Sequence, residues 1–162
     1  MRTFSLGAGK DTVVFESTPS ANGQDIITGF TAGVGGDVLA IGSGTSVDGL
    51  LGSAFGGVSK FVAASEGSGK GDLSSGSKQV LIHAGSTAIV EGANSISFDS
   101  SGTDKYKLGS SQKLFIVDTV GNANILYLAT ESSSSVTVTK VGTLNAGTDI
   151  TSLTADNFGN VA

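Results

Sequence analysis

The sequence Gly7-Ala8-Gly9-Lys10-Asp11-Thr12-Val13-Val14-Phe15 opens the region, residues 7–41, on which the expected fold depends. A similar order of residues returns twice in that region, at 23–30 and at 33–41. Each time, a glycine-containing turn leads through an aspartate into a short run of β-branched and large apolar residues. Glycine takes positive φ without steric cost, and an aspartate beside inward-pointing turn carbonyls supplies the hard oxygen ligands that suit calcium. The pattern predicts turns anchored to a core by short strands, with Ca²⁺ as the candidate cofactor.

Two copies of this pattern resemble the nonapeptide repeat of the hemolysin-type calcium-binding (RTX) family, G-G-x-G-x-D-x-U-x with U large and apolar. The copies match at Gly7, Gly9, Asp11 and Val13, and again at Gly33, Gly35, Asp37 and Leu39, with Leu6 and Ala32 replacing the first glycines. Residues 25–30 resemble the D-x-I-x-D-F segment that often follows such repeats, with Gly29 in place of the second aspartate. The resemblance implies that Asp11, Asp37 and Asp25 bind calcium, while Gly7, Gly9, Gly33 and Gly35 permit the turns.

The spacing of the aspartates limits what this resemblance implies. In the family, calcium lies between adjacent turns built from uninterrupted nine-residue repeats, and the separation of Asp11 from Asp37 is not a multiple of nine. The sequence therefore encodes one or two isolated calcium sites at most. The alternative is that these Gly-Asp pairs are ordinary turn residues.

Composition indicates one domain with a surface of turns and strands. The chain has 162 residues, 25 glycines, a single proline and only 14% charged residues, against about 25% charged in an average protein. The glycines follow no three-residue period, which excludes collagen. A weakly charged surface rich in Ser, Thr and Gly suits a secreted protein, extracellular or assembled on a bacterial cell surface.

Charge and hydropathy exclude several classes of partner. The net charge is −5 and the nine basic residues form no cluster, so no nucleic-acid partner is expected. No apolar run approaches the roughly 18 residues of a membrane span, so no membrane insertion is expected. Cysteine is absent, which rules out disulfides and thiolate metal sites. The N-terminus lacks the pattern of a charged n-region followed by an apolar h-region, and we expect the chain to be a cut from a longer protein.

After residue 41 the sequence predicts loops and then a succession of strands. Apolar residues at 47–58 follow helical spacing, but glycines oppose a stable helix, so we expect either a short helix or a packed irregular loop. Residues 65–77 form a Gly/Ser loop. The expected strands are 60–63, 79–83, 87–90, 95–98, 113–118, 124–128 and 135–141, with Gly121-Asn122 as a hairpin turn.

The closing third resembles the C-terminal region of type I secreted RTX-related proteins, which include S-layer proteins and adhesins. Phe115, Val117, Gly121, Asn122, Leu126 and Tyr127 match a strand couple of that region. Leu144, Gly147, Asp149, Leu153, Thr154, Ala155, Asp156, Asn157 and Phe158 match its ending. The resemblance implies that a type I secretion transporter reads this ending.

No catalytic constellation is recognisable, and we expect that the chain is not an enzyme. His83 is the only histidine and lies in an apolar run, which predicts a strand residue whose tip reaches solvent or a carbonyl. H-E-x-x-H and G-x-S-x-G are both absent. The acidic residues are mostly single and embedded in turns.

The sequence predicts an all-β fold with at most one short helix. The expected architecture is a β-roll or solenoid near the N-terminus, continued by β-hairpins or a sandwich. One domain spans residues 1–162, with a calcium-turn region at 1–41, a glycine-rich connection at 42–77 and a strand region at 78–162. The first functional hypothesis is an export and folding module that folds with calcium outside the cell. The alternative is a structural or adhesive β-domain that binds its own copies or a surface glycan.

Overall fold

The computed structural model describes residues 1–65, 71–74, 78–85, 89–99, 104–145 and 147–162 of the chain. Strands dominate these residues, and α1 (Pro19–Asn22) is their only α-helix. The all-β prediction is therefore confirmed. Short runs of β-branched and apolar residues between glycine turns favour strands over helices.

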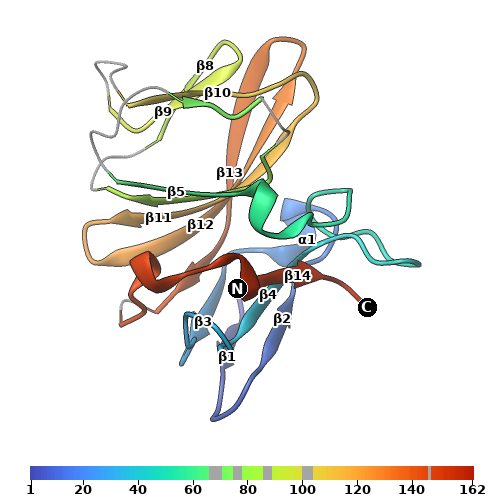
Figure 1. Ribbon diagram of the computed structural model, residues 1–162, viewed down its shortest axis with the longest axis vertical. Coiled ribbons are helices and arrows are strands. Elements are labelled where there is room, and N and C mark those ends of the chain that lie inside the picture. Colours follow the sequence, from blue (N-terminus) through green and yellow to red (C-terminus); the bar gives the residue numbers. More distant parts are fainter. Residues whose placement is uncertain (66–70, 75–77, 86–88, 100–103, 146) are drawn as a thin grey trace.

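The strands form three sheets, which we call A, B and C (Figure 1). Sheet A has the order β1 (Thr3–Ser5), β3 (Asp25–Thr28), β13 (Ser135–Leu144), β12 (Ala123–Ser132), β11 (Lys113–Val120), β7 (Val80–Ala84) and β5 (Phe61–Ser65). Sheet B has the order β14 (Phe158–Asn160), β4 (Val38–Gly42) and β2 (Thr12–Val14). Sheet C has the order β6 (Gly71–Asp72), β10 (Lys105–Lys107), β9 (Ser95–Ser97) and β8 (Val90–Gly92). Within the part of the chain that the structure describes, the connections contain three short 3-10 helices, η1 (Gly57–Lys60), η2 (Ile150–Ser152) and η3 (Ala155–Asn157).

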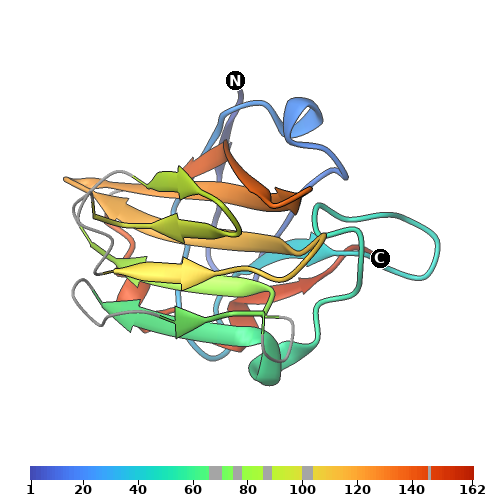
Figure 2. The ribbon, with the colours of Figure 1, turned by 90° about the horizontal axis from the view of Figure 1, so that it is seen from above.

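Sheet A is the middle layer and contributes to a hydrophobic core on each face. On β11, Phe115 and Val117 join the core shared with sheet B, whereas Leu114 and Ile116 join the core shared with sheet C. Figure 2 shows sheet C lying over sheet A. Burial on both faces explains why β7 and β11 are nearly continuous apolar runs in the sequence.

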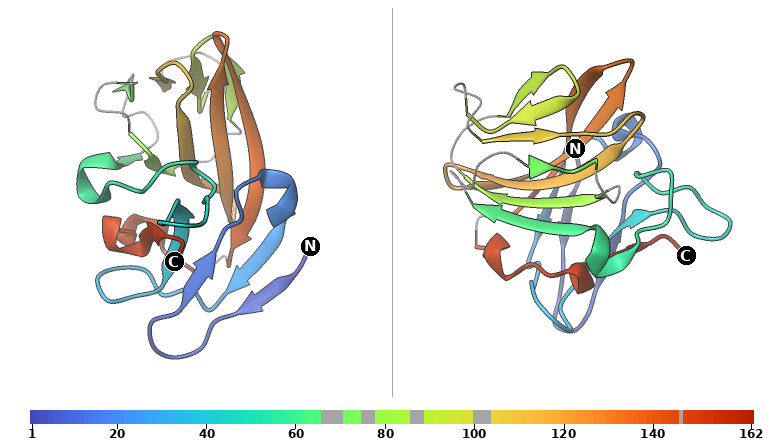
Figure 3. Two further views of the ribbon diagram at one scale, coloured as in Figure 1. Left: turned by 90° about the vertical axis from the view of Figure 1, so that its right-hand side faces the viewer. Right: turned by 45° about the horizontal axis from the view of Figure 1, so that its top comes forward.

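Three strand–turn–strand units, each leading from sheet A to sheet B, pair in parallel. Unit 1 comprises residues 3–14, unit 2 residues 25–42 and unit 3 residues 142–160. In sheet A, β1 and β13 pair on either side of β3, and in sheet B, β2 and β14 pair on either side of β4, all in parallel. The units lie at the end of the molecule away from sheet C (Figure 3).

Two hairpins join β11, β12 and β13. The predicted Gly121-Asn122 turn is confirmed, because Val120 pairs with Ala123 across it. The second turn is Ser133–Ser134, where both residues have positive φ.

The middle of the chain is a packed irregular loop rather than an α-helix. Leu50, Leu51 and Phe55 are buried in the core beside sheet B, and η1 follows them. Sheet A takes strands from all three sequence regions, 1–41, 42–77 and 78–162. Most of the predicted 65–77 loop and half of the predicted strand at 87–90 lie outside the described residues. In the described part of that loop, Ser65 ends β5 and Gly71–Asp72 form β6, so the loop prediction is wrong there.

Candidate functional site

A ladder of side-chain-to-backbone hydrogen bonds joins the turns of the three units. Asp37, at the end of the unit 2 turn, is fully buried. Its Oδ2 accepts the amide of Thr31 in its own turn, and its Oδ1 accepts the amide of Asp11 in unit 1, both at 2.7 Å. An ionised carboxylate that receives two amides forms strong, short hydrogen bonds.

Asn157 repeats the same arrangement one unit further along. Its Oδ1 accepts the amide of Thr154 in its own turn at 3.0 Å and the amide of Gly33 in unit 2 at 2.9 Å. Its amide nitrogen donates to the carbonyls of Gly33 and Asp37. In the sequence, Asn157 belongs to the segment that resembles a secretion-type ending, and no local pattern indicates this contact, which spans more than 100 residues.

The structure brings Asp11 and Asp37 together and places Asp25 elsewhere. Asp11 Oδ2 accepts the amide of Gly7 at 3.0 Å. Asp25 begins β3, at the opposite end of that strand from the unit 2 turn, and its Oδ2 forms an ion pair with the guanidinium of Arg2 at 3.1 Å. These three aspartates therefore do not converge on one point.

The contacts of these aspartates fit amide capping better than calcium ligation. Calcium takes six to eight oxygen ligands, whereas both Asp37 oxygens already face N–H groups and Asp25 already has a cationic partner.

Among the predicted glycines, Gly9, Gly33 and Gly35 do take positive φ. The position of Gly29 admits no aspartate, because its φ is +76° and a Cβ there would lie 2.6 Å from the Leu6 carbonyl oxygen.

The predicted secretion-type residues fold into unit 3. Leu144, Leu153 and Phe158 are buried, and Ala155, Asp156 and Asn157 form η3 after Thr154. Asp149 caps η2. Hydrogen bonds from the Thr151 hydroxyl, the Thr151 amide and the Ser152 hydroxyl lower the pKa of Asp149.

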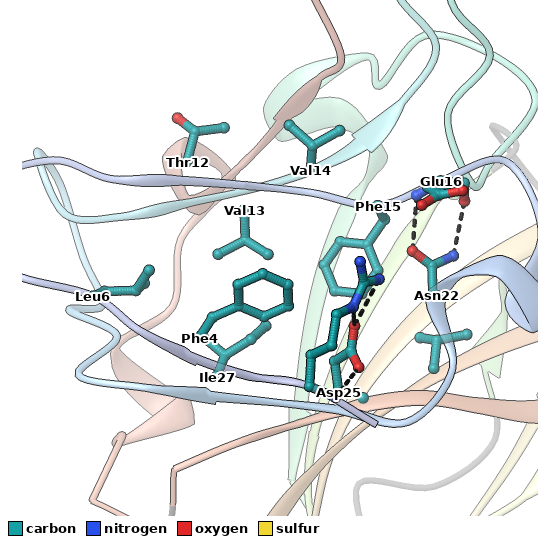
Figure 4. A pocket seen from close by; sticks show the side chains of 13 residues that line it. Phe4, Leu6, Thr12, Val13, Val14, Phe15, Glu16, Asn22, Asp25 and Ile27 are labelled. Atoms are coloured by element: carbon teal, nitrogen blue, oxygen red, sulfur yellow. Dashed lines mark hydrogen bonds and ion pairs between the residues drawn. The ribbon is translucent and has the colours of Figure 1, made fainter.

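The first unit leaves an open end between sheets A and B. A cavity of about 360 Å³ lies there, bounded by residues of β1, β2 and β3 and by Val141 and Gly142 of β13. Figure 4 shows Phe4, Leu6, Val13 and Phe15 pointing into the space between the strands, while Thr12 and Val14 lie on the other side of β2. Phe4 is nevertheless 37% exposed, and its ring lies 5.5 Å from the Arg2 guanidinium carbon.

A buried histidine lies between two carboxylates on the opposite face of sheet A. His83 of β7 contacts Asp118 of β11 through Nδ1 and Asp104, which precedes β10, through Nε2, each at 2.9 Å. His83 and Asp118 are fully buried, and the imidazole stacks on Phe98. The prediction that His83 lies in a strand is confirmed. The prediction that its tip reaches solvent or a carbonyl is wrong, because both ring nitrogens meet carboxylates distant in the sequence.

The surroundings of His83 have opposing effects on its ionisation. Burial lowers its pKa, but hydrogen bonds to Asp118 and Asp104 and the negative charges of both outweigh burial, so the pKa of His83 is raised above 6.5. Burial, and then the charge of Asp118, also raise the pKa of Tyr127. The cluster therefore favours a cationic imidazole that joins sheet A to the start of β10.

Comparison with known proteins gives no relative: no family model, no curated protein and no solved structure matches this chain. Within the residues that the structure describes, no helix is both long and apolar enough to cross a bilayer.

Proposed function

We propose that the chain is a non-catalytic structural β-domain whose parallel units fold without a metal ion. The observation that carries this proposal is the pair of hydrogen bonds at Asp37, which join units 1 and 2 where a calcium ion was expected. Because Asp37 is fully buried, its two bonds fix the relative position of the turns. The function is then to present a rigid surface in an assembly, which was the alternative hypothesis from the sequence.

Two features support a role other than catalysis. The single histidine is fully buried, so a dissolved substrate cannot contact it. The cavity at the open end is lined by apolar side chains, by Thr12, Glu16 and Asn22, and by the Arg2–Asp25 ion pair, whose two charges offset each other. Such a surface is suited to polypeptide rather than to a reacting small molecule.

For the fold of the three units, we propose the more specific description of a short β-roll. Their parallel pairing and glycine turns support that description. Secretion by a type I transporter, and placement at a bacterial cell surface, stay predictions of the family resemblance. The position of residues 144–158 within the third unit is compatible with a structural role for that segment.

Thermal melting in EGTA and in millimolar calcium tests the proposal. We expect the same melting temperature in both buffers. We also expect Asp37→Ala to lower stability equally in both, because it leaves the Asp11 and Thr31 amides without their acceptor. The loss is about 2 to 4 kcal/mol if each amide contributes about 1 to 2 kcal/mol.

The exposed Asp48 provides a control. Asp48→Ala removes a surface carboxylate and should leave the melting temperature unchanged in either buffer. A calcium-dependent rise of several degrees in the wild type that Asp37→Ala abolishes would overturn the proposal. It would favour the calcium-folding hypothesis instead.

A further inference from the structure

The hydrogen-bond ladder lacks one step at the open end. Asp37 and Asn157 each accept one amide from their own turn and one from the neighbouring unit. Asp11 accepts the amide of Gly7 in its own turn through Oδ2. Among the described residues, Asp11 Oδ1 has no corresponding amide from a neighbouring unit. A Cβ built on Gly7 or Gly9 would meet nothing within 4 Å, so there is room for another turn beside this one.

The inward-facing side chains show the same missing layer. Phe4, Ile27 and Leu144 are partners in adjacent strands of sheet A, and their exposures are 37%, 1% and 0%. Phe4 is thus the end of a column whose other members are covered by a neighbouring unit. A fourth unit would place its own apolar residue over the Phe4 ring.

The edge backbones of unit 1 are arranged to pair. Arg2 and Leu6 bond toward β3, and Asp11 and Phe15 bond toward β4. Because backbone groups alternate between the two sides of a strand, those of Thr3, Ser5, Thr12 and Val14 face the open side. Val14 also exposes 58% of its surface, on the outer face of β2. Strand edges of this kind are templates for pairing with another chain.

We infer that the open end binds a segment of another polypeptide as a fourth parallel strand–turn–strand unit. In this complex an amide of the partner's turn donates to Asp11 Oδ1, and an apolar partner residue covers Phe4. The partner surface continues the pairing that already joins units 1, 2 and 3. This inference rests on the proposed structural function and names the partner for it.

A second copy of this chain fits the open end less well. Two copies meeting edge to edge through a two-fold axis would pair their edge strands antiparallel. The turn of each copy would then lie at the far end of the other copy's strand. Asp11 Oδ1 would remain without a turn amide, so the ladder favours a separate polypeptide.

A synthetic peptide with the sequence of residues 24–42 is the probe, because it carries the strand–turn–strand pattern of unit 2. We expect saturable binding to the full chain, measured by fluorescence anisotropy, with a Kd of about 10 μM to 1 mM, because ordering the free peptide opposes binding. Hydrogen exchange should show new protection at the Thr12 and Val14 amides. A scrambled peptide of the same composition should not bind.

Variants of the protein test the proposed contacts. Asp11→Ala removes the acceptor and should weaken binding about tenfold, the effect of one hydrogen bond to a charged group. Asp11→Asn keeps an acceptor oxygen, as Asn157 does in unit 3, and should retain binding. Val14→Lys puts a charge on the edge strand and should abolish binding. Val58→Lys, on the exposed η1, is the matched control and should bind normally.

Three outcomes would overturn the inference. One is no saturable binding by a wild-type chain that melts normally. Another is binding that Asp11→Ala and Val14→Lys do not weaken. The third is a dimer in light scattering whose Thr12 and Val14 amides are protected without peptide, which would identify a second copy as the occupant. A calcium-dependent melting temperature would refute the proposed function and leave these binding results unaffected, so the two failures are distinguishable.

Discussion

The imidazole of His83 is the one basic group between two buried acids, and its charge sets the electrostatics of that part of the core. Asp104 and Asp118 contact its two ring nitrogens, and the rings of Phe98 and Tyr106 lie against it. A protonated His83 offsets part of the negative charge of the cluster. A neutral His83 would leave two carboxylates in a region of low polarity, which is costly.

Stability should therefore fall as the pH rises. The folded-state pKa of His83 is raised above 6.5, so its contribution is fully present below about pH 6.5 and is lost as the pH rises through the folded-state pKa. We expect the melting temperature of the wild type to decrease between pH 6 and pH 9. A histidine NMR titration should show a single imidazole with a pKa above 6.5.

His83→Gln is the matching variant. It keeps a polar side chain but cannot carry the charge, so the pH dependence over this range should flatten. Its stability at pH 6 should be lower by about 3 to 5 kcal/mol, as for other broken buried pairs. A variant with the same pH slope as the wild type would exclude His83 as the titrating group.

Turns determine how the strands of this chain pair. The two hairpins of sheet A have different residues in their turns. Gly121 takes a φ of +61° in the first hairpin, which costs a glycine little. In the second, Ser133 and Ser134 take φ values of 52° and 65°. A left-handed conformation costs about 1 to 2 kcal/mol in a residue that has a Cβ. Glu131 partly offsets this by accepting the Ser134 amide at 2.8 Å.

The double substitution Ser133→Asn with Ser134→Gly should stabilise the protein, because Asn-Gly suits a two-residue hairpin turn whose residues both have positive φ. We expect a gain of about 1 kcal/mol in urea unfolding with an unchanged m-value. Ser135→Gly, which adds the same flexibility within β13, should instead lower stability. An unchanged midpoint for the double variant would mean that Glu131 already compensates for the turn.

Local patterns predicted the elements whose signals lie within a few residues. The Gly121-Asn122 turn, the alternating strand at 135–141 and the strand containing His83 were all found where the sequence indicates them. Pairing between distant segments leaves no such signal. Unit 3 pairs with unit 2 across more than 100 residues, so the ladder through Asn157 and the open end at Phe4 could not be predicted.

The described residues form two hydrophobic cores on opposite faces of sheet A, and the two cores are built differently. The core beside sheet B is closed by the parallel units and the loop containing Leu50 and Phe55. The core beside sheet C is covered by strands of two or three residues. Short strands make few hydrogen bonds, so sheet C should open at a lower free energy than sheet A.

Native-state hydrogen exchange measures this difference. The amides of Ile96 and Tyr106 should exchange through a local opening, whereas those of Val117 and Leu126 should require global unfolding. Gly71→Ala should lower protection in sheet C alone, because its Cβ would lie 2.7 Å from the Tyr106 ring. Gly29→Ala, whose Cβ would lie 2.6 Å from the Leu6 carbonyl, is the paired variant for unit 1. Equal exchange free energies at all four amides would show a single cooperative unit.

Residues 43–141 separate the second unit from the third, and this separation affects the order in which the units can fold. Units 1 and 2 are made early, but one side of unit 2 stays bare until residues 142–160 arrive to cover it. While the chain emerges N-terminus first from a ribosome or a pore, units 1 and 2 would therefore remain incompletely folded. Synthesis or release of residues 142–160 would then allow closure, and a chain truncated before residue 142 would lack the strands that close unit 2.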